Sequence, residues 1–98
     1  MADDLTGDER VLTLRDEGRS FVAIAKELQL SSASEAIAAF NRAFEQREPS
    51  DQEALRTREV ARLDALGERV RRRTDLTEEE VDRRLQGLLR LRKALHVA

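Results

Sequence analysis

The chain has 98 residues, which is enough for one small domain or a mini-domain with an appendage and excludes two full domains. Charged residues make up 39% and aromatic residues 3%, which is typical of a helix-rich protein and excludes a β-sandwich. With no Cys and one His, disulfides, thiolate nucleophiles and the usual zinc sites are excluded, so we expect no enzyme, no metal and no cofactor. No apolar run is long enough to span a bilayer and no leader pattern is present, so we expect a cytoplasmic protein without a membrane partner.

The net charge of −2 is divided unequally along the chain. Residues 1–48 hold six basic and ten acidic side chains, a net charge of −4, whereas residues 49–98 hold twelve basic and ten acidic ones, a net charge of +2. Proteins that coat nucleic acids without sequence preference are usually strongly basic, because they neutralise phosphates. Neither half has that composition, so nucleic-acid binding needs support from a specific motif.

Helix starts are marked by a repeated signal, a Ser or Thr followed three residues later by Glu. In such a capping box the hydroxyl accepts from the backbone N–H of the third helical residue, and the Glu reaches back to the N–H of the cap. The four copies are Thr6/Glu9, Ser32/Glu35, Ser50/Glu53 and Thr77/Glu80. A fifth start is expected at Ser20, after a helix stop at Gly18.

The spacing of apolar residues agrees with these starts and predicts five helices. Their expected ranges are about 7–17, 21–28, 33–47, 51–73 and 78–95. Pro49 ends the third helix near Glu48, because a residue before proline disfavours the helical conformation. The predicted fold is all-α, with three short helices in a domain of residues 1–48 and a long antiparallel hairpin of two helices in residues 49–98.

The third helix has two predicted faces. The core stripe is expected to be Ala33, Ile37, Phe40 and Phe44. The outer face is expected to be Glu35, Ala38, Ala39, Arg42 and Gln46.

Residues 18–31 have the layout of the first helix and turn of a helix-turn-helix. Ala25 is the small residue where the two helices cross, Leu30 fills the turn, and the serines that follow start the next helix. Gln29 stands where such turns usually have Gly, so it must tolerate a left-handed or adjusted backbone. The segment 31–34 lengthens the turn or the first turn of the next helix.

Three blocks of the chain together resemble a known group. They are residues 18–30, residues 34–44 as recognition helix, and residues 53–66 followed by a C-terminal helix with the sequence LLRLRKAL. With its lengthened turn, the chain resembles small helix-turn-helix proteins of actinobacteria and their phages that are described as like the phage terminase small subunit. The resemblance implies DNA binding by the first three helices and oligomerisation through the later ones; a chromosomal relative in transcription regulation is equally compatible.

Candidate DNA contacts follow from the chemistry of the side chains. Arg42 could read guanine with two hydrogen bonds, and Glu35 could accept from the amino group of cytosine. Residues that could hold phosphate, through cations or through hydroxyls at a helix N-terminus, are Arg19, Lys26, Ser31, Ser32, Ser34 and Arg47. The alternative is that the serines only cap a helix and that the three helices form a structural or protein-binding core.

The segment 69–73 is the densest basic cluster of the chain. Its arginines could contact a phosphate backbone. The simpler interpretation is that they complement the negative end of the fourth helix and pair with Glu78, Glu79, Glu80 and Asp82 across the short turn.

Ten aliphatic side chains of the last two helices are candidates for oligomerisation. They are Leu55, Val60, Leu63, Leu66, Val70, Val81, Leu85, Leu88, Leu89 and Leu95. A pair of helices buries only the facing sides of its apolar stripes, so we expect these helices to pack on their copies in a homodimer or larger ring. Two functions stay open: a DNA-binding oligomer, or a helical adaptor that binds a protein partner through the last two helices.

Overall fold

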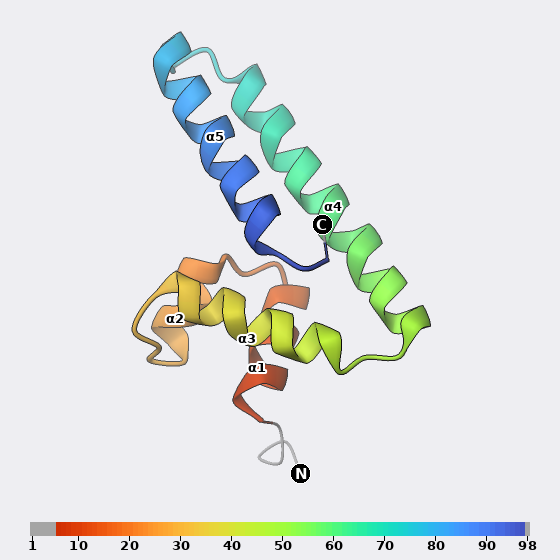
Figure 1. Cartoon of the computed structure of the whole chain (residues 1–98). Coiled ribbons are helices and arrows are strands. Elements are labelled where there is room, and N and C mark those ends of the chain that lie inside the picture. Colours follow the sequence, from red (N-terminus) through yellow and green to blue (C-terminus); the bar gives the residue numbers. More distant parts are fainter. Residues whose placement is uncertain (1–5, 98) are drawn as a thin grey trace. The chain divides into compact units, whose positions relative to one another are not determined.

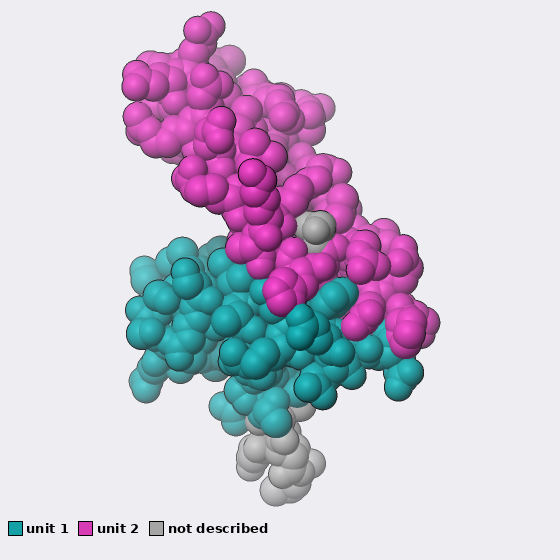
Figure 2. All heavy atoms as spheres, in the orientation of Figure 1, with its two compact units in different colours: residues 1–48 teal, residues 49–98 magenta. Residues whose placement is uncertain are grey.

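The computed structural model describes residues 6–97, and these residues form five α-helices and no strand. The chain divides into two compact units, residues 1–48 and residues 49–98 (Figure 2). The helices of the first unit are α1 (Gly7–Asp16), α2 (Phe21–Glu27) and α3 (Ala33–Glu45) (Figure 1). Those of the second unit are α4 (Pro49–Arg72) and α5 (Glu78–Ala94). The all-α fold class is as predicted.

Four of the five predicted helix starts are confirmed by their caps. In each, the cap hydroxyl accepts a hydrogen bond from the backbone N–H three residues on, at 3.1–3.3 Å. The four caps are Thr6, Ser20, Ser32 and Thr77. At Thr77 the capping box is complete, because the Glu80 carboxylate accepts from the Thr77 N–H at 3.3 Å.

The predicted start at Ser50 is wrong. The fourth helix begins at Pro49, so Ser50 lies inside its first turn. Proline suits the first helical position, because the N–H that it lacks would have no partner there and its φ is already helical. The Glu53 carboxylate pairs with Arg56 at 3.0 Å instead of reaching back to a cap.

The core of the first unit is built around two aromatic rings. Phe21 and Phe40 meet edge to face with ring centroids 5.6 Å apart. The guanidinium of Arg15 lies 4.3 Å from the centroid of the Phe21 ring and donates to the Arg19 carbonyl at 3.0 Å. Arg15 is only 4% exposed. Arg15 therefore belongs to the core, which a pattern based on hydrophobic residues does not indicate.

The predicted core stripe of α3 is partly wrong. Phe40 and Phe44 are buried as expected, but Ala33 and Ile37 are only half-buried. Ala39, predicted for the outer face, is 5% exposed, and further buried residues of α3 are Ala36, Asn41 and Ala43. The reason is that α3 packs against both α1 and α2, so its buried arc is wider than one stripe and the alanines let the backbones approach.

In the second unit, α4 and α5 run antiparallel and contact each other (Figure 1). Arg92 of α5 pairs with Asp64 of α4 at 2.6 Å. The residues between the helices are 73–77, where Arg73 donates to both carboxylate oxygens of Asp75. No described helix is long and apolar enough to cross a membrane.

Candidate nucleic-acid interface

The turn between α2 and α3 has a left-handed residue at its centre. Gln29 has φ +57°, and the N–H of Leu30 donates to the Ala25 carbonyl at 2.8 Å, which ends α2 in the manner of a Schellman motif. The prediction that Gln29 adopts an adjusted backbone is confirmed. Gly18 plays the same part after α1, with φ +93° and the Arg19 N–H on the Leu14 carbonyl at 3.2 Å.

The start of α3 is held by serines and one carboxylate. The Ser32 hydroxyl accepts from the Glu35 N–H, while the Glu35 carboxylate accepts from the N–H of Ser31 at 2.8 Å and from its hydroxyl at 2.5 Å. These hydrogen bonds from Ser31, first from its hydroxyl and then from its backbone, lower the pKa of Glu35. Of the predicted contacts, Ser31, Ser32 and Glu35 are thus brought together, and the exposed Ser34 follows on α3.

Arg42, the predicted reader of guanine, is 58% exposed on α3 and forms a two-pronged ion pair with Asp8 of α1. Its Nε and Nη2 atoms each donate to one Asp8 carboxylate oxygen at 2.9 Å. Hydrogen bonding to Arg42 lowers the pKa of Asp8, and the same bonds raise the pKa of Arg42. Asp8 therefore occupies the donor fork that a guanine edge or a phosphate would use.

A shallow pocket lies beside this pair and has a volume of about 190 Å³. Its edge holds Asp8, Arg10, Glu35 and Arg42, and its apolar wall includes Leu30 from the turn. Asp8 and Arg10 were not among the residues predicted from the sequence. Asp8 is 34 residues from Arg42, and nothing in the local sequence links the two.

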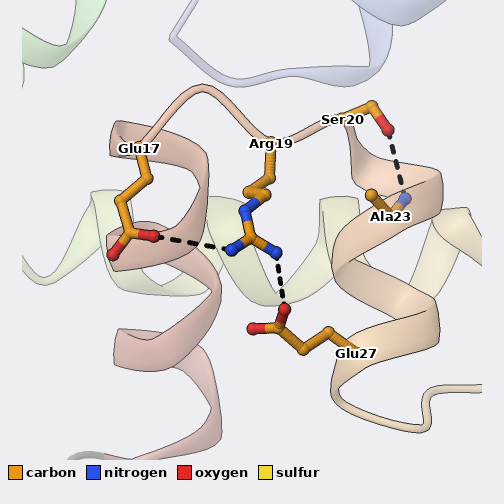
Figure 3. A network of polar contacts seen from close by, with 5 residues as sticks. All are labelled: Glu17, Arg19, Ser20, Ala23 and Glu27. Carbon is orange, nitrogen blue, oxygen red and sulfur yellow. Dashed lines mark hydrogen bonds and ion pairs between the residues drawn. The ribbon is translucent and has the colours of Figure 1, made fainter.

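Arg19 and Arg47 are also paired with carboxylates. Arg19 lies in the loop before α2, 2.5 Å from Glu27 and 4.0 Å from Glu17 (Figure 3). Arg47 follows α3 and pairs with Glu9 of α1. Lys26 is exposed on α2. Three of the four cations predicted to contact DNA are therefore neutralised within the first unit.

The ten predicted oligomerisation residues differ widely in burial. Leu55, Leu63 and Leu95 are at most 7% exposed, and Leu89 is 52% exposed. The half-buried ones are Val60, Leu66, Val70, Val81, Leu85 and Leu88. No residue of α5, all of which the structure describes, is buried. A groove of about 680 Å³ runs between α4 and α5.

Two arginines of the basic cluster at the end of α4 form ion pairs other than the predicted ones: Arg71 pairs with Glu68 at 3.3 Å within α4, and Arg73 pairs with Asp75 in the loop. Of the predicted partners, Glu80 at the start of α5 acts on Arg73 through its charge, which raises the pKa of Arg73 after the larger effects of Asp75. Within residues 6–97 there is no group of His, Cys, Asp or Glu that could hold a metal ion. Comparison of the chain with family models, with curated proteins and with solved structures finds no match.

Proposed function

We propose that the chain is a non-enzymatic, helix-turn-helix DNA-binding protein, similar to phage terminase small subunits or to transcription regulators, and that it binds as an oligomer. The observation that carries the proposal is the turn from α2 to α3. In this turn Gln29 is left-handed, the Leu30 N–H donates to the Ala25 carbonyl, and Ser32 caps the next helix. A short turn of this kind between two helices in contact supports the proposal, because a helix-turn-helix needs one.

The outer face of α3 is the surface that a DNA groove would meet. Its exposed residues include Ser34, Ala38 and Arg42, and the small Ala38 permits close approach of the helix to bases. Binding requires an exchange, in which a guanine edge or a phosphate replaces Asp8 on the Arg42 guanidinium. The exchange is possible because the pair is surface-exposed, where ion pairs contribute little to stability.

Fluorescence-anisotropy titration with random and genomic duplexes at low salt tests the proposal. Arg42→Ala should weaken binding to a preferred duplex roughly five- to hundredfold, the usual discrimination of a two-pronged contact with guanine. Asp8→Asn should strengthen binding severalfold, because it frees the guanidinium. Affinity should fall steeply with salt, since cations supply much of the attraction.

Two matched variants control for charge alone. Arg90→Ala in α5 removes the same charge as Arg42→Ala, and Asp51→Asn in α4 removes the same charge as Asp8→Asn; both residues are exposed in the second unit. Neither should change affinity as much as its counterpart. The proposal would be refuted if neither the wild type nor Asp8→Asn bound any duplex at tens of micromolar protein.

The pairing of cations in the first unit favours a second candidate, a helical adaptor that has lost DNA binding. The unit carries a net charge of −4, and Arg19, Arg42 and Arg47 are all occupied by carboxylates. Such an adaptor would bind a protein partner through the apolar stripes of α4 and α5.

Purification from a native extract treated with nuclease separates the two candidates. A stoichiometric protein partner that survives the nuclease, together with no titratable DNA binding, supports the adaptor. Loss of every partner along with the DNA supports the DNA-binding protein.

A further inference from the structure

The groove of the second unit is a surface with an apolar floor and charged edges. Leu63, Leu85 and Leu88 lie around Gly67 on its floor, and Leu89 stands at its edge with 52% exposure. Leu85 and Leu88 of α5 lie beside Gly67 of α4, since a Cβ built at Gly67 would be in ordinary van der Waals contact with them, at 3.9 Å and 4.0 Å. Contiguous apolar surface of this kind usually marks an interaction site.

The residues of α5 that line this groove are arranged symmetrically about position 87. Asp82 and Arg92 lie five residues before and after that position, and Leu85 and Leu89 lie two residues before and after it. Two copies of α5 packed antiparallel at this level would therefore set Asp82 of each copy against Arg92 of the other. Leu85 of each copy would meet Leu89 of the other.

Charged residues of α4 are also arranged symmetrically, about a point that lies level with position 87 of α5. Asp64 and Arg71, which also line the groove, are equally far from the peptide bond between Gly67 and Glu68. Gly67 lies level with residues 85–88 of α5, as the short distances to Leu85 and Leu88 show. One two-fold axis perpendicular to both helices therefore sets opposite charges against each other on both of them, beside the pairs Arg92–Asp64 and Arg71–Glu68 that each chain forms within itself.

We propose that this groove binds the same groove of a second copy of the chain, with the two-fold axis crossing α4 and α5 at the level of Gly67. The result is an antiparallel four-helix bundle with α5 against α5 and α4 against α4. The mixed signs at the edges favour this self-complementary occupant over a nucleic acid, which needs a basic surface. The inference specifies the oligomer of the proposed function and does not depend on DNA binding.

Light scattering without DNA, at about 100 micromolar chain, is the first test. The wild type should have twice the mass of the 11.2 kDa chain. Leu89→Lys should reduce the mass to that of one chain, because it places a cation in the apolar contact. The matched control is Ala61→Lys, which adds the same charge to an exposed position of α4 outside the groove and should stay a dimer.

A charge exchange between chains is the second test and does not depend on Leu89. Asp82→Lys and Arg92→Glu should each weaken self-association at least about tenfold, because like charges then face each other twice per dimer. Mixed in equal amounts, the two variants should form heterodimers in preference to either homodimer, since both cross-chain pairs become opposite again, while the Arg92–Asp64 pair stays broken in the chain with Arg92→Glu. Native mass spectrometry distinguishes the heterodimer from the homodimers.

The proposal is overturned by any of four results with proteins whose circular dichroism shows an intact helix content. A wild-type monomer would mean that the groove does not bind a second copy of the chain. A dimer that persists in Leu89→Lys, or an assembly larger than a dimer, would place the contact on another surface. Homodimers and heterodimers in statistical proportion would refute the antiparallel register.

Discussion

At the scale of single residues, the first unit is governed by carboxylates that hold arginines. Asp8, Glu9 and Glu27 each occupy a guanidinium that the sequence offers to a nucleic acid. The pairs join α1 to α3 and the loop before α2 to the end of α2, so they also tie the helices together. Arginines that are predicted from the sequence to contact DNA form ion pairs with carboxylates in the folded unit.

Acid should weaken the folded first unit through Asp8. Hydrogen bonding to Arg42 holds the pKa of Asp8 below its ordinary value, so the pair stabilises the fold above the unfolded pKa of about 4 and this stability is lost as the pH falls through the folded pKa. Urea unfolding at pH 7 and pH 3 should show a smaller loss for Asp8→Asn than for the wild type.

Arg42→Gln provides the control for this pH dependence. It leaves Asp8 in place but removes its donor, so it should reduce the acid sensitivity as much as Asp8→Asn does. The double variant should add nothing further, because both changes remove one interaction. Additive effects would show that Asp8 and Arg42 act independently and would contradict the role of the pair.

At the scale of helices and turns, the left-handed Gln29 is a position where glycine should stabilise the fold. A non-glycine residue with φ +57° carries a steric penalty that glycine lacks. Gln29→Gly should therefore raise the free energy of unfolding by about 0.5–1 kcal/mol, measured by urea denaturation. Gln46→Gly is the matched control, since the φ of Gln46 is −84° and glycine there should destabilise.

The complete capping box of α5 gives a second prediction at this scale. Thr77→Ala removes the hydroxyl that accepts from the Glu80 N–H and should lower the stability by about 1 kcal/mol. Thr74→Ala changes an exposed threonine in the same loop that caps no helix, and its stability should stay close to that of the wild type. Equal effects of the two changes would mean that loss of the cap is not the cause.

Helix starts could be predicted from the sequence because capping is local. The hydroxyls of Thr6, Ser20 and Ser32 accept hydrogen bonds from N–H groups three residues further on. A pattern of this length can be recognised in the sequence without knowledge of the fold. The prediction failed at Ser50, where the neighbouring Pro49 starts the helix itself. The buried face of α3 could not be predicted as reliably, because contacts with α1 and α2 decide it.

At the scale of the whole molecule, only part of the candidate site could be predicted from the sequence. Arg42 was found from its place on α3, but its partner Asp8 is 34 residues away and belongs to no shared motif. The symmetry of Asp82 and Arg92 about the groove likewise has meaning only once α4 and α5 are known to lie side by side. Long-range pairing of this kind is a product of the fold.

Dimerisation and DNA binding should be coupled in the whole chain. A dimer presents two copies of α3, so a duplex with two suitable sites is held by both, and the second contact benefits from a high effective concentration. Leu89→Lys should therefore weaken DNA binding by at least about tenfold, although it leaves the first unit unchanged.

Ala61→Lys separates this effect from charge. Both variants add one cation, which by itself increases attraction to phosphate, so a loss of affinity confined to Leu89→Lys has to arise from loss of the dimer. Anisotropy titrations of both variants with one duplex at one salt concentration make the comparison. Equal affinities for DNA would mean that each copy binds alone, and the oligomer would then have no part in recognition.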